Sequence, residues 1–277
     1  MKKTAESIKA QKGKNNITML TAYDSLFSSI LDEADIDIVL VGDSVGMVAL
    51  GYNSTIPVTL DDIIHHTSAA ARSVKNSLVV ADMPFMTFGI SEENTLKNAA
   101  ALIQKGSADA VKLEGAGSNL KSIEVLVEKG IPVMGHLGLT PQSIKQFGSY
   151  KTRGTTQEEA EAIVKDAKKL EEAGAFAIVL EKIPYKLAEF ITQSISIPTI
   201  GIGAGPFCDG QVLVLYDMLG MFDKFTPKFV KKYAELKPAI LEAVTHYKKD
   251  VTSGSFPELK HSFDINDEIM NNLKNRK

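Results

Sequence analysis

The chain has 277 residues, of which 44% are hydrophobic, and its formal net charge at pH 7 is −3. No apolar stretch approaches the roughly 18 residues that a membrane helix needs, so no membrane partner is expected. Lysine and arginine are spread along the chain without a basic stripe, which argues against a nucleic-acid partner. The amino terminus has no apolar segment behind its two lysines and does not read as a signal peptide. One cysteine, Cys208, excludes an internal disulfide, and a cytoplasmic location fits.

The apolar pattern predicts strands and helices in alternation. A short polar helix is expected at residues 2–12, with Ile8 to seat it. The predicted strands are at 17–22, 38–41, 78–81, 110–113, 131–136, 177–180, 197–205 (running into a glycine loop) and 211–216. The predicted helices are at 25–34, 59–74, 91–106, 118–128, 156–174, 184–194 and 229–251.

Most of the predicted strands are apolar throughout rather than alternating, which is typical of a parallel sheet that is covered on both faces. Eight strand–helix repeats predict an α/β fold, a closed (β/α)₈ TIM barrel in one domain over residues 1–277. A short N-terminal helix precedes the barrel and a C-terminal helical tail follows it, with 264–277 as a peripheral end. The alternative is a doubly wound open sheet. In both folds, ligands bind at the carboxyl ends of the strands.

Five of the predicted strands run directly into an ionisable residue. These residues are Asp43, Asp82, Glu114, His136 and Glu181. Because the carboxyl ends of parallel strands share one rim, the five side chains are predicted to converge on a single site.

Three carboxylates of this set, Asp43, Asp82 and Glu114, come from successive strands. Crowded carboxylates repel one another and raise each other's pKa unless a cation lies between them. Oxygen-only ligands favour a hard ion, with Mg²⁺ expected before Ca²⁺ or Mn²⁺. The alternative interpretation is that each acid caps a helix or pairs with a lysine or arginine.

Lys112 lies two residues before Glu114, so the two side chains are predicted to share the interior face of the barrel. A lysine there either neutralises an anionic substrate or forms a buried salt bridge with one of the acids. Ser44, next to Asp43, either contacts a ligand or caps the following turn.

Glu181 is predicted to lie apart from the metal, in a largely apolar setting that suits a general base. The alternative is an ion pair with Lys182 or Arg153. His136 is an additional pocket candidate, as a base, a substrate contact or a core histidine. The glycine loop at 201–205 either binds an anion with its amides or packs tightly, and the loops at 45–58 and 137–155 are lid candidates.

Five stretches together resemble the ketopantoate hydroxymethyltransferase family, in order and over nearly the whole chain. They lie at 41–47 (VGDSVGM), 81–85 (ADMPF), 111–115 (VKLEG), 135–142 (GHLGLTPQ) and 201–205 (GIGAG). The resemblance implies a barrel of the phosphoenolpyruvate/pyruvate class and a homo-oligomer, commonly a decamer. It also implies the first step of pantothenate biosynthesis. In that step a hydroxymethyl group passes from 5,10-methylenetetrahydrofolate to 3-methyl-2-oxobutanoate through a Mg²⁺-stabilised enolate, giving 2-dehydropantoate (ketopantoate).

The resemblance also assigns roles residue by residue. It places one Mg²⁺ per subunit on Asp43, Asp82 and Glu114, and ketoacid contacts on Asp43, Ser44, Asp82 and Lys112. It makes Glu181 the proton acceptor.

Two other functions stay open at this point. A Mg²⁺-dependent lyase or mutase of the same barrel class would act on a small 2-oxo acid, but such enzymes typically rely on a cysteine in a mobile loop. Cys208 lies after the seventh predicted strand, away from such a loop. A metal-stabilised scaffold would explain the barrel but not Lys112 and Glu181 at its mouth.

Overall fold

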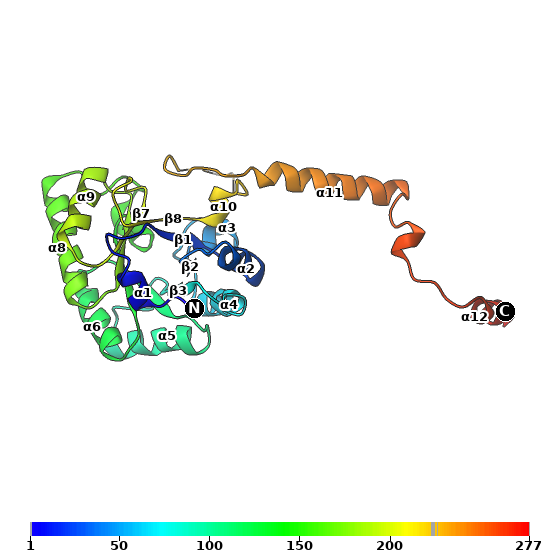
Figure 1. Cartoon of the computed structure of the whole chain (residues 1–277), viewed down its shortest axis with the longest axis horizontal. Helices are drawn as coiled ribbons and strands as arrows, with labels where there is room; N and C mark the ends of the chain where they lie inside the picture. Colours follow the sequence, from blue (N-terminus) through cyan, green and yellow to red (C-terminus); the bar gives the residue numbers. More distant parts are fainter. Residues whose placement is uncertain (1, 223–224, 226, 277) are drawn as a thin grey trace.

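The computed structural model describes residues 2–222, 225 and 227–276, so the ends of the predicted domain, Met1 and Lys277, lie outside it. Eight parallel strands close into a barrel in which each strand pairs with its sequence neighbours and β8 pairs with β1 (Figure 1). The strands are β1 Ile17–Thr21, β2 Ile38–Val41, β3 Leu78–Asp82, β4 Ala110–Glu114, β5 Val133–Gly138, β6 Ala177–Glu181, β7 Thr199–Ile202 and β8 Gly210–Leu213. The predicted closed barrel is confirmed, and the open sheet is excluded.

Helices surround the barrel and connect most of its strands (Figure 1). The α-helices are α1 Ala5–Lys9, α2 Ser25–Glu33, α3 Val45–Val48, α4 Leu60–Ala71, α5 Glu92–Gln104, α6 Leu120–Glu128, α7 Ile144–Phe147, α8 Gln157–Glu172, α9 Tyr185–Ser194, α10 Leu215–Met218, α11 Leu236–Ser253 and α12 Asp267–Lys274. Three short 3₁₀ turns are η1 Gly117–Asn119, η2 Pro141–Ser143 and η3 Leu259–His261.

The strand residues alternate between two apolar layers. Ile38 and Leu40 point into the barrel, whereas Val39 and Val41 pack under the surrounding helices. Ile8 of α1 is fully buried and belongs to the interior layer, so the predicted N-terminal helix closes the barrel at the end opposite the strands' carboxyl ends. Apolar side chains thus fill the interior at the amino ends of the strands, and the polar side chains lie at the carboxyl ends.

Two predicted boundaries were wrong near the C-terminal part of the barrel. The eighth strand ends at Leu213, and Leu215 begins α10, with its amide donating to Thr21 Oγ1 at 3.1 Å. The helix predicted from 229 begins only at Leu236. The amides of Tyr233 and Leu236 donate to the carbonyls of Met218 and Leu219 instead of forming helical bonds, so this segment is tied to the end of α10.

The last part of the chain leaves the barrel as an extended arm, residues 236–276, that holds α11, η3 and α12 (Figure 1). All of α11 after Leu236 is exposed, so the peripheral segment begins earlier than the predicted residue 264. No helix within the described residues combines the length and apolar character needed to cross a membrane.

Candidate active site

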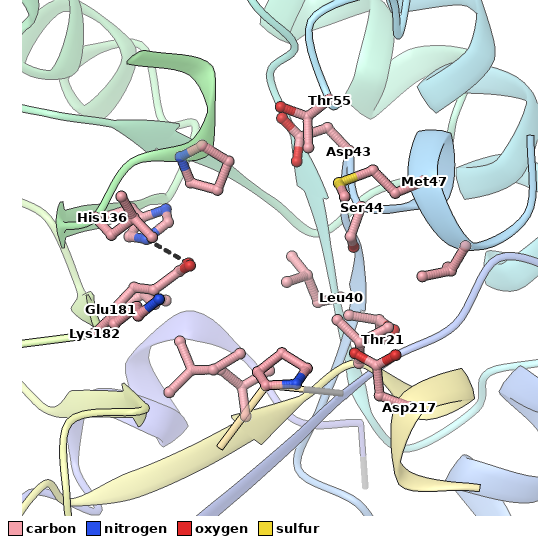
Figure 2. A pocket seen from close by; sticks show the side chains of 18 of the residues that line it. Thr21, Leu40, Asp43, Ser44, Met47, Thr55, His136, Glu181, Lys182 and Asp217 are labelled. Atoms are coloured by element: carbon pink, nitrogen blue, oxygen red, sulfur yellow. Dashed lines mark ion pairs between the residues drawn. The ribbon is translucent and has the colours of Figure 1, made fainter. Parts of the chain in front are cut away.

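A cavity of about 460 Å³ lies at the carboxyl ends of the strands. It is lined by all seven predicted site residues: Asp43, Ser44, Asp82, Lys112, Glu114, His136 and Glu181. Figure 2 shows His136 and Glu181 on one side of the cavity, with Asp43 and Ser44 facing them. The structure therefore brings together side chains from five strands that are spread over about half of the chain.

The strand register explains which of these side chains meet. Asp82 of β3 is paired with Lys112 of β4, and Glu114 of β4 is paired with His136 of β5. The side chains of Val80, Ala110 and Met134 point into the barrel. Side chains two residues further along each strand point the same way, so Asp82, Lys112 and His136 also face the interior, closer to the carboxyl ends of the strands. The pairing of neighbouring strands therefore places an acid beside a lysine and another acid beside a histidine.

Lys112 is almost fully buried, and its Nζ lies 2.8 Å from Asp82 Oδ1. Burial alone would lower the pKa of this lysine, but the charges of Asp82, Glu114 and Asp43 outweigh burial and raise it, so the ammonium stays charged. The salt bridge that the sequence left as one alternative is present. The same ammonium also lines the cavity, where it can meet an anionic substrate.

Asp43 is also buried, and its pKa is raised well above the ordinary value by burial and by the charges of Asp82 and Glu114. Its Oδ2 accepts a hydrogen bond from Gln142 Nε2 at 2.9 Å, and its backbone amide donates to Asp82 Oδ2 at 2.9 Å. The backbone amide of Gln142 donates to Glu114 Oε2, also at 2.9 Å. Gln142 therefore holds two of the three predicted metal ligands.

The donor set around the three carboxylates fits a hard cation. Oδ1 of Asp82 is buried without a directed hydrogen bond, and only the Lys112 charge compensates it. Among the described residues, no three histidine, cysteine or acidic side chains form a ready-made metal cage. Mg²⁺ commonly uses one or two carboxylates and completes its shell with water and substrate oxygens, and the residues present fit that mode of binding.

Glu181 lies in a more polar setting than predicted. Its Oε2 is 3.2 Å from His136 Nε2, an ion-pair contact that is drawn as a dashed line in Figure 2. Neither predicted alternative partner pairs with it, because Arg153 pairs with Glu159 and Lys182 donates to the carbonyl of Tyr150. The predicted apolar setting is therefore interrupted by the imidazole of His136, which reaches the carboxylate from the neighbouring strand β5.

His136 links the two halves of the site. Its Nδ1 lies 3.3 Å from Lys112 Nζ and 3.5 Å from Glu114 Oε1, while its Nε2 faces Glu181. Burial and the Lys112 charge lower its pKa, but the two glutamates outweigh them and raise the pKa to about 9. His136 is thus a buried polar bridge between the metal-ligand candidates and the candidate base.

Ser44 does not cap the following turn with its side chain, because its Oγ lies 2.9 Å from the hydroxyl of Tyr23. Tyr23 is buried directly after β1, and burial raises its pKa, so the phenol stays protonated. The sequence analysis missed Tyr23, although it follows a predicted strand at the same rim as the acids.

The glycine loop packs tightly. A Cβ atom at Gly203 would lie 2.7 Å from Phe229 Cδ1, and one at Gly205 would lie 2.3 Å from Tyr185 Cβ. Both glycines also have positive φ angles, which other residues adopt at a cost. Of the two interpretations, close packing accounts for this loop.

Both predicted lid segments border the cavity. Met47, Val48 and Thr55 come from the first, whose start is the short helix α3. Leu139, Pro141 and Tyr150 come from the second, which contains η2 and α7. Their motion stays a prediction.

The fold and the charged cavity at its mouth define a (β/α)₈-barrel enzyme. The chain belongs to the ketopantoate hydroxymethyltransferase family, whose model matches residues 2–259. It is 56% identical over 255 residues to a 3-methyl-2-oxobutanoate hydroxymethyltransferase of Caldicellulosiruptor bescii, covering 92% of this chain and 96% of the relative. It is 52% identical over 275 residues to an enzyme of the same name from Clostridioides difficile, covering 99% and 100%.

Solved structures share the fold at low sequence identity. Phosphoenolpyruvate phosphomutase from Streptomyces platensis matches with a TM-score of 0.61 and 11% identity, covering 99% of this chain and 98% of that one. The 2,3-dimethylmalate lyase matches with a TM-score of 0.59 and 15% identity, covering 98% and 91%. These structures share the closed (β/α)₈ barrel fold of this chain, which is the fold that the sequence predicted.

Proposed function

We propose that the chain transfers a hydroxymethyl group from 5,10-methylenetetrahydrofolate to 3-methyl-2-oxobutanoate, giving 2-dehydropantoate in the first step of pantothenate biosynthesis. The observation that carries the proposal is the juxtaposition of Lys112, Glu181 and three acids in one cavity. The names and high identity of the relatives support the substrate, which is chemically suited to such a site.

Asp43, Asp82 and Glu114 would hold the Mg²⁺ ion, with Gln142 fixing two of them. When bound, Mg²⁺ would withdraw electron density from the ketoacid's oxygens and acidify its C3–H bond.

The protein's own groups then do the proton chemistry. The Glu181 carboxylate accepts the C3 proton, and its contact with His136 fixes its orientation. The charged ammonium of Lys112 offsets negative charge that develops on the keto oxygen. Lys112 and Glu114 are 4% and 5% exposed, and charges fixed in such a buried setting interact more strongly than charges in water. The resulting carbon nucleophile forms a bond to the one-carbon unit of the folate. The bonds between that carbon and the folate nitrogens break, water supplies the hydroxyl oxygen, and tetrahydrofolate leaves.

The experiment separates the two halves of this reaction. In deuterated buffer without folate, the enzyme with Mg²⁺ should exchange the C3 proton of 3-methyl-2-oxobutanoate, as read by NMR. Adding 5,10-methylenetetrahydrofolate should then give 2-dehydropantoate, and EDTA should stop both reactions. Exchange without the hydroxymethyl product would overturn the folate donor, and products of C–C cleavage would favour a lyase.

The proposal includes a homo-oligomer, for which the decamer of the family is the expected size. Helix α11 carries an exposed apolar stripe at a spacing of four, three and four residues, at Ile240, Val244, Tyr247 and Val251. The barrel offers a place for such a helix, because β7 and β8 are joined without a helix. Among the described residues between β8 and α11, α10 is the one helix, and it has four residues.

The covering surface in a second copy is expected near α2, whose Leu26 and Ile30 are 67% and 50% exposed. Each arm would thus supply a neighbour with the helix that its own barrel lacks. The proposal also places the enzyme in the cytoplasm. Its partners are small-molecule substrates, and no nucleic-acid or membrane partner is expected.

A further inference from the structure

The cavity has a second wall that the ketoacid chemistry does not use. Opposite the charged side, it is lined by apolar side chains that include Val212, Val214, Phe222 and Phe229. A small ketoacid occupies only part of about 460 Å³, which is the size of a site for a much larger ligand. This wall therefore has room for a flat ring whose faces can pack against apolar side chains.

One acid interrupts this apolar wall. Asp217, in α10, lines the cavity, and Figure 2 shows it across the cavity from His136 and Glu181. None of the described residues gives its carboxylate a hydrogen bond or an ion pair. Burial raises its pKa to about 6, so the group is still largely ionised at neutral pH. A half-buried carboxylate without a partner costs free energy, and a ligand with hydrogen-bond donors would offset that cost.

The reduced folate of the proposed function has the matching chemistry. The pyrimidine ring of its pterin is planar, and one edge of this ring carries a ring N–H beside an exocyclic amino group. Two parallel donors fit the two oxygens of one carboxylate, and such charge-assisted bonds are among the strongest in proteins. Aromatic side chains such as Phe222 and Phe229 can cover the faces of the ring.

We propose that Asp217 binds the pyrimidine edge of the pterin of the folate co-substrate and so sets its orientation in the cavity. The one-carbon unit is carried at the other end of the pterin. Anchoring the pyrimidine edge at α10 therefore directs that unit toward the side of the cavity where Lys112 and Glu181 lie. Asp217 is a binding and orienting residue and takes no part in proton transfer. The inference rests on the proposed function, because it requires a folate donor.

The test compares the parent with Asp217→Asn, which keeps the shape but replaces one acceptor oxygen by a donor. Tetrahydrofolate binding is measured by calorimetry with Mg²⁺ present, and C3 proton exchange of the ketoacid is measured without folate. The variant should bind tetrahydrofolate about 10- to 100-fold more weakly. Its exchange rate should stay within about twofold of the parent's, which also shows that it is folded. Asp61→Asn, an exposed acid of α4, is the matched control and should change neither value.

An analogue makes the assignment specific. The parent should prefer tetrahydrofolate to its 2-desamino analogue, and Asp217→Asn should lose most of this preference. Unchanged affinity in the variant, or an unchanged preference, would overturn the role of Asp217. If the variant does not fold, equal affinities of the parent for the two folates would overturn it. Absence of C3 proton exchange in the parent would instead contradict the proposed function. Tetrahydrofolate binding could still be measured in that case, so the two failures are distinguishable.

Discussion

The side-chain amide of Gln142 donates a hydrogen bond of 2.9 Å to Oδ2 of Asp43, which lies 99 residues earlier in the chain. The same amide group donates to the carbonyl of Met83 at 3.0 Å, and the Gln142 backbone amide reaches Glu114. Gln142 is thus a buried clamp between β2, β3 and β4. Groups that orient metal ligands in this way strongly affect metal affinity.

Replacing Gln142 by leucine should weaken Mg²⁺ binding in the presence of ketoacid by about 10- to 100-fold, because Asp43 loses its orienting donor. Calorimetry of Mg²⁺ binding checks this, and circular dichroism checks the fold. Gln157→Leu, an exposed position on α8, is the control. Parent-like Mg²⁺ affinity in Gln142→Leu would show that the clamp has no role in metal binding.

Replacing Glu181 by glutamine should abolish C3 proton exchange while leaving ketoacid binding nearly intact, since the amide keeps the shape but cannot accept the proton. NMR in deuterated buffer and calorimetry with the ketoacid read the two properties separately. Glu172→Gln, exposed at the end of α8, should behave as the parent. If exchange persisted at the parent rate, another residue would be the base.

Replacing Lys112 by methionine should cost about 3 kcal/mol of stability in Mg²⁺-free buffer, because Asp82 is left buried without its counter-charge. Added Mg²⁺ should then raise the Tm of this variant by more than it raises the Tm of the parent, since the cation replaces the lost positive charge. Turnover should nevertheless fall by about 100-fold or more. Thermal unfolding with and without Mg²⁺ tests the first two results, and an equal Mg²⁺ effect on both proteins would contradict them.

Asp32 offers a pH-dependent test away from the active site. This carboxylate is 8% exposed and accepts the backbone amides of Lys75, Asn76 and Ser77 at 2.8–3.0 Å. Burial tends to raise its pKa, but these hydrogen bonds outweigh burial and hold the pKa below its ordinary value of 3.8. The carboxylate's contribution to stability is therefore complete above about pH 4 and is lost as the pH falls through the lower, folded-state pKa.

Asp32→Ala should reduce the free energy of unfolding by about 2–4 kcal/mol at pH 7, because three buried or half-buried amides lose their acceptor. The difference in the free energy of unfolding between the variant and the parent should become smaller as the pH falls below about 4. Urea unfolding at several pH values measures it, with Glu33→Ala, exposed on the same helix, as the control. A difference that did not depend on pH would argue that the charge is unimportant.

A charge placed in the exposed apolar stripe of α11 should weaken assembly of the oligomer. Val244→Glu, in the middle of the stripe, should reduce the mass of the oligomer in light scattering, because a charge would enter an apolar interface. His246→Glu introduces the same charge on the opposite side of the helix and should leave the mass unchanged. Equal masses for both variants and the parent would contradict packing of this stripe against a second copy.

The barrel, the strand ends and the seven cavity residues could be predicted from the sequence because they depend on local patterns. An apolar run followed by a turn marks a strand end within a few residues, and alternation places Lys112 and Glu114 on one face. Residues whose importance depends on a distant partner left no such signal. Gln142 lies in the stretch 135–142, which carries part of the family resemblance, yet no local pattern indicates that its side chain reaches Asp43.

The order of the residues along the chain is enough to show which side chains gather at the mouth of the barrel, because it contains both the strand periodicity and the strand direction. Their pairing follows only from the folded barrel: His136 rather than Lys182 lies beside Glu181, and the carboxylate of Asp217 has no partner among the described residues. It also decided that α11 leaves the barrel and exposes its apolar stripe. Pairing depends on register, curvature and packing between segments far apart in the chain, and these are properties of the closed barrel rather than of any one stretch.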